Sequence, residues 1–385
     1  MCRILLVNER PLLELFPRLA PHAGFSILGD FPTPVEPLQL LAPDFGRAAQ
    51  GCYVKRDDLS SLLYGGNKVR TLEALFGQAQ REGKDWVAAT GAYGSNHAVA
   101  TVLHGGRLGF RCAALLFPQP ESDSARANLS VSLARADQVV SLPHWSCLPW
   151  GMWCFARQRR RRRESALIMP PGGASPRGCL GFLSAGLELG LQVRAGVLPA
   201  PREVVLALGS TCSTAGLLVG LLLATRLGLG FDSGSTASPR PRLVAVRVTP
   251  WPVTSSLRIL RLAGNVAAWL RRLSGDRVFD MDRAELARGL EIDERQLGRG
   301  YGHATPSGLA AMARAGALSA ALDPTYSAKS VAGLLARATS AQPCERLFWS
   351  TKSSAPLPDV AAAELEGSPR RMLRWLGPIA AGSQR

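Results

Sequence analysis

Residues 203–227 read EVVLALGSTCSTAGLLVGLLLATRL, and this stretch decides the fold class. The first six residues, Glu203–Leu208, form an apolar run of the kind that makes a buried strand. Residues 209–213 are small and mostly polar, and residues 214–227 are apolar over the length of a helix. A strand that passes through a short loop into a helix is the repeating unit of a parallel sheet covered by helices.

The same pattern occurs elsewhere in the chain. An amphipathic helix is predicted by the helical spacing of Val69, Leu72, Leu75, Phe76 and Ala79, and Gly83 can end it. Further predicted elements are a strand at 86–90 (WVAAT), a helix at 95–108, strands at 111–117 (RCAALLF) and 242–248 (RLVAVRV), and a surface loop at 232–242 (DSGSTASPRPR). We therefore expect an α/β protein with open, mostly parallel sheets and helices on both faces.

Length and composition narrow the function classes. The chain has 385 residues, about two domains' worth, and 46% of them are hydrophobic, which suffices for packed cores. The longest apolar runs, such as 217–224, fall well short of the roughly 20 residues of a membrane span. The apolar run near the N-terminus is too short for a secretory signal. We expect a cytoplasmic protein without a membrane partner.

The cysteines do not indicate a metal site. Eight of them are scattered along the chain without a CxxC pair and without histidines at zinc-finger spacing. A secreted disulfide framework is also not expected in a chain of this size. The prediction is reduced, mostly buried thiols and no bound metal.

The net charge of +16 would attract polyanions, so a nucleic-acid-binding scaffold has to be considered. The strongest signal is the run 157–163 (RQRRRRR), which follows a segment rich in proline and tryptophan, 142–153. Such runs usually lie on a solvated face, and no aromatic side chain is interleaved in this one for base stacking. We interpret residues 142–165 as a basic insertion and expect no specific nucleic-acid partner.

Three small-residue segments could carry chemistry. In the first, Gly65-Gly66-Asn67-Lys68 follows the sequence YVKRDDL at 53–59, so the lysine stands at a helix start. The helix field and burial both disfavour its ammonium form, and a neutral lysine amine can form a Schiff base with an aldehyde. A surface lysine beside a flexible turn is the alternative for this segment taken alone.

The other two segments each follow a predicted strand. Ser95, Asn96 and His97 open a helix, where a serine caps and free backbone amides bind anions. The loop at 209–216 (GSTCSTAG) can cradle a phosphate in the same way, yet it matches neither the Walker pattern nor GxGxxG. Ligands of open α/β sheets bind at the carboxyl ends of strands, so both segments are candidate sites.

Together these segments resemble one family. KRDDL, GGNKVRTLE, SNH, PGGAS at 171–175, GSTCSTAGL, Tyr301-Gly302 and LDPTYSAK at 322–329 are similar to the D-cysteine desulfhydrase/1-aminocyclopropane-1-carboxylate deaminase family. The resemblance extends from about residue 33 to 351. It implies pyridoxal phosphate as cofactor, a homodimer, and two open, mostly parallel twisted sheets with the cofactor in the cleft between domains. The implied larger domain is 1–65 with 190–385, and the smaller is 66–189.

The resemblance also implies roles for individual residues. Lys68, with Asn67 beside it, would bind the cofactor covalently, and Asn96 would hydrogen-bond its phenolic oxygen. Ser95, Asn96 and His97 would receive the substrate carboxylate, and Tyr301 and Tyr326 would line the substrate side of the ring. Ser327 would face the pyridine nitrogen, and the phosphate cradle would consist of Ser210, Thr211, Cys212, Ser213 and Thr214.

The reaction implied is α,β-elimination from a small amino acid such as D-cysteine, giving pyruvate, ammonia and sulfide. Lys68 or Ser95 would remove the α-proton, and Tyr326 would assist proton transfer. Ser327 and His97 resemble the desulfhydrase branch, because ring-opening deaminases have a carboxylate and usually a glutamine there. Ring-opening deamination, elimination from serine or an O-acylated serine, and a cofactor-binding relative without turnover remain alternatives. Cys212 stands where the family usually has glycine.

Overall fold

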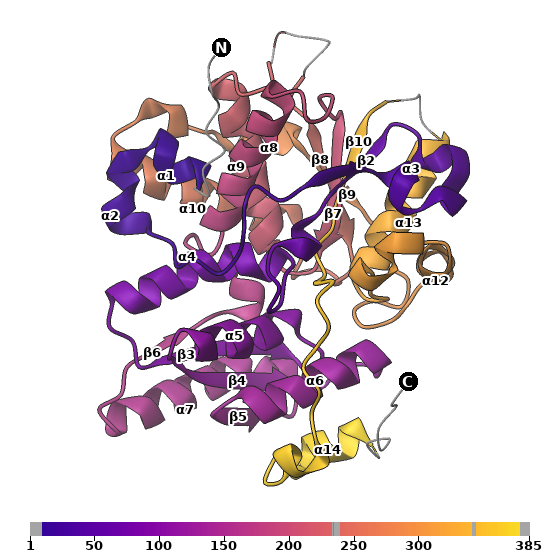
Figure 1. The fold of residues 1–385 in the computed structure, drawn as a ribbon. Coiled ribbons are helices and arrows are strands. Elements are labelled where there is room, and N and C mark those ends of the chain that lie inside the picture. The colour runs from indigo at the N-terminus through magenta and orange to yellow at the C-terminus, as the bar shows by residue number, and fades with distance from the viewer. Residues whose placement is uncertain (1–9, 233, 235–238, 341–343, 378–385) are drawn as a thin grey trace. The chain divides into compact units, whose positions relative to one another are not determined.

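The computed structural model describes residues 10–232, 234, 239–340 and 344–377 (Figure 1). The described part of the chain forms two compact units. The large unit contains residues from 1–78 and 173–355, and the small unit contains residues from 79–172 and 356–385. None of the described helices has both the length and the apolar character needed to cross a lipid bilayer.

The large unit is built on a six-stranded sheet. Its strand order is β1-β2-β10-β7-β8-β9, and only the pairing of β1 with β2 is antiparallel. The strands are β1 (Val35–Pro37), β2 (Cys52–Lys55), β10 (Arg346–Trp349), β7 (Glu203–Leu208), β8 (Arg242–Arg247) and β9 (Leu290–Asp293). The large unit's helices are α1 (Pro11–Leu15), α2 (Ala20–Ala23), α3 (Leu38–Leu41), α8 (Leu180–Arg194), α9 (Thr211–Arg226), α10 (Ser256–Ser274), α11 (Arg283–Arg288), α12 (Pro306–Ala313), α13 (Ser327–Ser340) and most of α4 (Asn67–Arg81).

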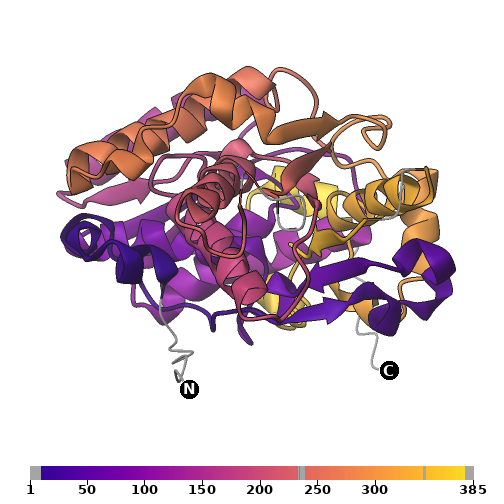
Figure 2. The same ribbon diagram turned by 90° about the horizontal axis from the view of Figure 1, so that it is seen from above.

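Helices cover both faces of this sheet because apolar side chains of its strands alternate between the faces. Val204, Leu206 and Leu208 of β7 pack with α8, α9 and α10 on one face. Val205 packs with α13 on the other face. Figures 1 and 2 show α9 and α13 on opposite sides of the strands.

The small unit has a four-stranded parallel sheet in the order β5-β4-β3-β6. One face packs on α7 through a cluster that includes Trp86 and Phe155, and α5 contacts β3 and β4. Its elements are β3 (Trp86–Ala92), α5 (Asn96–Arg107), β4 (Arg111–Phe117), α6 (Asp123–Arg135), β5 (Gln138–Ser141), α7 (Leu148–Arg161), β6 (Ala166–Ile168) and α14 (Arg370–Leu376). The predicted fold class, two mostly parallel sheets with helices on both faces, is confirmed.

Most predicted elements match observed ones. The strands predicted at 86–90, 111–117, 203–208 and 242–248 correspond to β3, β4, β7 and β8, and the predicted helices correspond to α4, α5 and α9. Helix α9 begins at Thr211, three residues before the predicted start, because the extended backbone of Ser210 (φ −98°, ψ 157°) is its N-cap. The amides of residues 211–213 are therefore helix-start amides. Of the loop predicted at 232–242, residues 233 and 235–238 lie outside the described residues, as do Cys2 and the rest of 1–9.

The two compact units differ from the predicted domains at three places. Residues 66–78 and 173–189 belong to the large unit, where Arg70 on α4 pairs with Asp57 and Glu188 on α8 pairs with Lys55. Residues 356–377 contact the small unit. Trp375 of α14 lies edge-on to Tyr93, with 5.2 Å between ring centroids, and its Nε1 donates to the carbonyl of Gln119 (3.0 Å). Packing of a C-terminal helix on another unit leaves no local signal in the sequence.

The basic insertion is helical. Residues 157–161 form the last turns of α7, and Arg157 and residues 160–163 are exposed, as predicted for a solvated face. Arg159 is the exception because it is buried, pairs with Glu164 (2.8 Å) and lies over the Trp86 ring. One member of the run therefore supports the core of the small unit.

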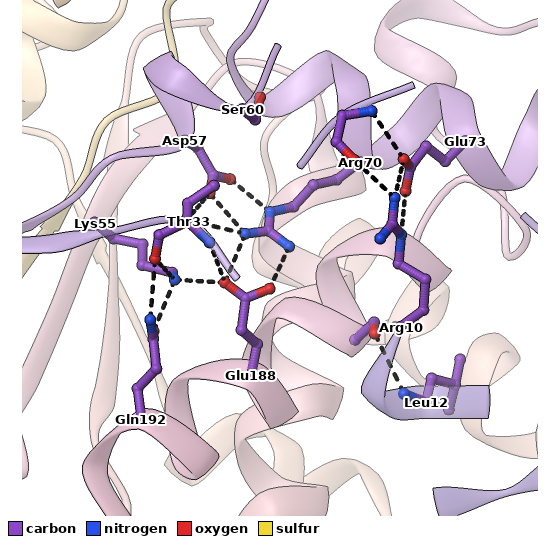
Figure 3. Close-up of polar contacts among 12 residues, drawn as sticks. Arg10, Leu12, Thr33, Lys55, Asp57, Ser60, Arg70, Glu73, Glu188 and Gln192 are labelled. Atoms are coloured by element: carbon purple, nitrogen blue, oxygen red, sulfur yellow. Dashed lines mark hydrogen bonds and ion pairs between the residues drawn. The ribbon is translucent and has the colours of Figure 1, made fainter. Parts of the chain in front are cut away.

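A buried charge cluster lies where β2, α4 and α8 meet in the large unit (Figure 3). The Arg70 guanidinium donates to both oxygens of Asp57 (2.7 Å each) and to both oxygens of Glu188 (2.8 and 3.0 Å). Lys55 donates to Glu188, to Gln192 and to the Thr33 carbonyl. All these side chains are less than a tenth exposed, so each charge depends on its partners for stabilisation.

The cluster predicts a specific acid sensitivity. Arg70 and Lys55 lower the pKa of Glu188 to about 2, against the cost of burial and from an ordinary value of 4.5. A lowered folded-state pKa stabilises the protein above pH 4.5, and this stabilisation is lost as the pH falls through about 2. The Glu188→Gln variant leaves two buried cations with one carboxylate, so we expect its free energy of unfolding to fall by about 3–5 kcal/mol at neutral pH.

Urea unfolding of both proteins between neutral pH and pH 3 tests this prediction. The difference between wild type and Glu188→Gln should shrink on acidification. Glu285→Gln is the control because Glu285 forms an exposed pair with Arg226, which is worth about 0–1 kcal/mol. A Glu188→Gln effect as small as that of the control would contradict the prediction.

Candidate active site

Lys68 is held at the start of α4 by two close backbone contacts. Gly66 has φ +86°, and a Cβ at this position would lie 2.5 Å from the carbonyl oxygen of Thr351. That same carbonyl accepts from the amide of Asn67 (3.0 Å). The Gly65 amide donates to the Ser353 hydroxyl (2.8 Å). Glycine is needed at 66 because the chain passes the 351–353 turn too closely for any side chain, and at 65 because a Cβ there would lie 2.4 Å from the carbonyl oxygen of Asp58.

The Lys68 amine differs from the other lysines. The chain has five lysines, and Lys55, Lys84, Lys329 and Lys352 each donate to a carboxylate, amide or carbonyl oxygen. For the Lys68 amine, no hydrogen bond or ion pair is formed with any described residue. Loss of hydration lowers its pKa, and only the nearby Cys212 thiol opposes that shift. A neutral, nucleophilic amine is therefore favoured at this position.

The start of α9 lies beside that lysine. The side-chain amide of Asn67 donates to the Ser213 hydroxyl at 3.1 Å, which joins the first turns of α4 and α9 across 146 residues of sequence. The Thr214 hydroxyl is fully buried and has no hydrogen-bond partner among the described residues. The Ser210 hydroxyl does not cap the helix. Helix-start amides with an unsatisfied buried hydroxyl are suited to an anion such as a phosphate.

The Cys212 side chain packs against α8. Its sulfur lies 3.3 Å from the carbonyl oxygen of Gly173 and 3.9 Å from the sulfur of Cys179. A hydrogen bond from Cys179 lowers the pKa of Cys212, against the opposing effect of burial. Cys212 can thus contribute its backbone amide to the anion site, as the glycine usual in the family does. The seven described cysteines are free thiols.

Two tyrosines stand at the end of β7. The hydroxyls of Tyr301 and Tyr326 are 2.6 Å apart, and the Tyr326 ring lies so close to Gly209 that a Cβ there would be 2.6 Å from the ring. Burial raises the pKa of Tyr301 to about 12 and raises that of Tyr326 well above its ordinary value. Both phenols are therefore protonated at neutral pH and act as donors or acids.

Ser327 is buried at the start of α13. Its hydroxyl accepts from the amide of Asp323 (2.7 Å) and lies 3.5 Å from an Asp323 carboxylate oxygen. That oxygen also accepts the amides of Tyr326 (2.6 Å) and Ser327 (3.1 Å). Lys329 donates to the carbonyls of Leu297 and Gly300, which fixes the loop before Tyr301. Asp323 and Lys329 are positioning residues that the sequence patterns did not single out.

The remaining predicted residues lie on α5 of the small unit. The Ser95 hydroxyl accepts from the amide of Ala98 (3.2 Å) and so caps the helix. Asn128 on α6 donates to the side-chain oxygen of Asn96 (2.7 Å) and to the Gly94 carbonyl (3.0 Å), and these contacts orient the Asn96 amide. His97 is buried. Asn128 was missed because nothing in the local sequence relates it to Asn96.

The large unit thus brings together Lys68, Asn67 and the start of α9, and it brings Tyr326 against the loop that precedes α9. The small unit carries Ser95, Asn96 and His97. Their roles remain predictions.

Comparisons with known proteins agree with this arrangement. Residues 27–347 match the family model described as "Pyridoxal-phosphate dependent enzyme". The chain belongs to the pyridoxal-phosphate dependent enzyme family. A D-cysteine desulfhydrase from Klebsiella pneumoniae subsp. pneumoniae is 30% identical over 342 residues, 84% of this chain and 89% of that protein. A nocardicin C-9' epimerase from Nocardia uniformis subsp. tsuyamanensis is 35% identical over 212 residues, and this match covers 52% of the chain and only 59% of the epimerase.

Solved structures of this family share the fold. A structure described as an ACC deaminase homologue superposes with a TM-score of 0.69 at 25% identity, covering 89% of this chain and 95% of that one. The processed form of threonine deaminase isoform 2 from Solanum lycopersicum gives a TM-score of 0.52 at 15% identity, with 90% and 88% covered. The cofactor of the family is pyridoxal phosphate. The orphaned Thr214 hydroxyl, the α9 amides and the neutral Lys68 amine fit its phosphate and its aldehyde.

Thr214 offers a direct test of the phosphate site. Removing its hydroxyl in Thr214→Val takes away a hydrogen bond to a charged group, worth about 1.5–3 kcal/mol, so we expect pyridoxal phosphate to bind roughly ten- to a hundredfold more weakly. Equilibrium titration of the apoprotein, followed by absorbance, measures the affinity. Thr225→Val on the same helix is the matched control, since the Thr225 hydroxyl bonds the carbonyl of Leu221 (2.9 Å) within that helix. Equal affinities in the two variants would contradict the assignment.

Proposed function

We propose that this chain catalyses α,β-elimination from D-cysteine or a closely similar small D-amino acid, releasing pyruvate, ammonia and sulfide. The observation that carries the proposal is the match to D-cysteine desulfhydrase over 84% of this chain and 89% of the relative. The hydroxyl of Ser327 supports it, because a hydroxyl facing the pyridine nitrogen resembles the desulfhydrase branch.

We propose the following roles for the site residues. Lys68 would hold the cofactor, and its free amine would accept the α-proton, since its lowered pKa favours the neutral form and no described residue hydrogen-bonds to it. The start of α5, with Ser95 and the amides of Asn96 and His97, receives the substrate carboxylate. Pyridoxal phosphate, when bound, supplies the electron sink that stabilises charge at the α-carbon.

The departing sulfur needs a proton, and Tyr326 is proposed to supply it. Its raised pKa keeps the phenol protonated, and its hydrogen bond to Tyr301 holds the hydroxyl in place. The C–S bond breaks as the α-proton passes to Lys68 and the phenolic proton passes to sulfur. Water then releases ammonia and pyruvate from the three-carbon product.

A second candidate is epimerisation at the α-carbon, which the 35% identity to nocardicin C-9' epimerase favours. Both reactions begin with removal of the α-proton, and epimerisation returns a proton to the opposite face. Ring-opening deamination of 1-aminocyclopropane-1-carboxylate is a third, favoured by the likeness to the ACC deaminase homologue.

Substrate screening of the holoenzyme separates these candidates. We expect pyruvate and sulfide in equal amounts from D-cysteine, much less from L-cysteine, and no 2-oxobutyrate from 1-aminocyclopropane-1-carboxylate. Exchange of the α-hydrogen in D₂O with inversion and without pyruvate would identify an epimerase instead. A visible cofactor band without turnover of any amino acid would contradict the proposal.

Lys68→Ala should abolish both the visible band of the lysine-bound cofactor and turnover. Borohydride reduction of the wild type, followed by peptide mass spectrometry, should place the cofactor on Lys68. Lys352→Ala is the control because it removes another partly buried lysine, whose amine donates to carbonyl oxygens. Trapping at any other lysine would refute the assignment.

Tyr326→Phe tests the acid. We expect kcat for D-cysteine to fall by about 10²–10⁴-fold, the usual contribution of a general acid. With β-chloro-D-alanine the fall should be much smaller, because chloride leaves without a proton. The cofactor band should persist in this variant. Equal losses with both substrates would show that Tyr326 positions the substrate and does not act as an acid.

The resemblance also suggests a homodimer and a cytoplasmic location. We propose both, and sedimentation velocity of the holoenzyme and cell fractionation measure them.

A further inference from the structure

A polar cavity lies in the large unit, at the edge of the sheet where the parallel strands begin. Its volume is about 610 Å³, within the range of small-molecule sites. We call it the arginine pocket; its lining residues are Arg202, Glu203, Pro239, Arg240, Pro241, Arg242, Arg288, Gly289, Cys344 and Arg346. The candidate active site follows the other end of β7, about 20 Å away for a strand of six residues. The two sites are therefore separate.

Four chain segments converge to place five arginine residues around this cavity. The segments precede or open strands β7, β8, β9 and β10, so the parallel sheet itself sets their spacing. Like charges at such spacing repel one another, and bringing them together costs free energy unless an anion compensates for them.

The carboxylates nearby do not balance this charge. Glu203 is the carboxylate that lines the pocket, and it is shared by Arg346 and by Arg337 outside the pocket. Arg242 pairs with Glu291, which does not line the pocket. The 2% exposed Arg346 side chain is fixed there by Glu203 (2.9 Å) and the Cys344 carbonyl (3.2 Å).

Two arginines of the pocket form no ion pair with a described carboxylate. Within the described chain, Arg240 donates to the carbonyl of Glu285 (3.3 Å), and its guanidinium lies against Gly289, 3.1 Å from where a Cβ would be. Burial lowers the pKa of Arg240, the charge of Glu285 opposes this shift, and the charges of Arg288 and Arg226 add to it. The Arg288 side chain makes no hydrogen bond or ion pair with any residue that the structure describes.

We propose that the arginine pocket binds a small molecule with two or more anionic oxygen groups, either a phosphate ester or a polycarboxylate. Guanidinium groups offer planar pairs of donors that match phosphate and carboxylate oxygens, and they stay charged when partly desolvated. The ligand would neutralise Arg240 and Arg288 between the two prolines of the rim. This site is independent of the function proposed above.

Binding of inorganic pyrophosphate and of citrate to the holoenzyme, followed by isothermal titration calorimetry, tests the proposal. The holoenzyme is used because its cofactor fills the phosphate site at α9. Saturable binding of pyrophosphate alone would indicate a site for a phosphate ester, and binding of citrate alone would indicate a site for a polycarboxylate. Binding of both would indicate a site that accepts either class. Sodium chloride at matched ionic strength controls for screening.

The double variant Arg240→Gln/Arg288→Gln should bind the responsive probe at least about tenfold more weakly, as expected for the loss of charge-assisted hydrogen bonds. Arg283→Gln is the matched control, since Arg283 is an exposed arginine of α11, as Arg288 is, but does not line the pocket. The cofactor band and turnover should be unchanged in both. Should the double variant lose the cofactor band, the single variant Arg288→Gln replaces it, because that exposed side chain has no described partner to lose.

The proposal would be overturned if neither probe bound saturably, or if the Arg240→Gln/Arg288→Gln variant kept the wild-type affinity for the probe. It would also be overturned if Arg283→Gln lost as much affinity as the double variant. That last result would show only general attraction to a basic protein.

Discussion

The clamp of Asp57 and Glu188 on the Arg70 guanidinium is the constraint on which the site depends. Arg70 is two residues after Lys68 on α4, so fixing its guanidinium fixes the first turn of that helix. Asp57 also accepts from Nε1 of Trp349 (2.7 Å), which ties the clamp to β10. Buried charges tolerate few alternative arrangements, because every displaced group would lose partners that water cannot replace. The KRDDL segment thus positions the site through the ion pairs of Lys55 and Asp57.

Two helix starts meet beside this clamp. The Asn67–Ser213 hydrogen bond brings the first turns of α4 and α9 together, and both carry the positive end of a helix dipole. The same field that attracts a phosphate at α9 disfavours an ammonium group at Lys68. The two adjacent helix starts therefore favour both an anion bound at α9 and a neutral amine at Lys68. The close approach of Gly66 to Thr351 makes this possible, since a side chain there would separate the segments.

Local patterns predicted strands β3, β4, β7 and β8, because buried parallel strands are uninterrupted apolar runs, and they predicted helices α4, α5 and α9. The other described strands and helices were not predicted. Patterns also indicated Lys68 and the α9 loop, where small residues mark close backbone approaches. The partners that make these residues effective were not predictable. Glu188 is 118 residues from Arg70, Asn128 is 32 from Asn96, and the Thr351 turn is nearly 300 from Gly66. Asp323 stands in the LDPTYSAK motif, but its contact with Ser327 was not predicted, because the sequence does not show that its carboxylate lies beside that hydroxyl.

Lysine and arginine have different uses in this protein: a lysine serves the proposed chemistry of the site, and arginines supply most of the positive charge. Of 45 basic residues only five are lysines. Arginine keeps its proton even when buried, as the raised pKa of Arg70 shows, and so serves wherever a permanent charge is needed. Lysine can lose its proton, yet Lys55 and Lys329 are buried against oxygen acceptors that stabilise the ammonium form. Lys68 combines a removable proton, loss of hydration and the absence of a described acceptor. These three conditions together make an amine reactive toward an aldehyde, and among the five lysines only position 68 meets all of them in the described structure.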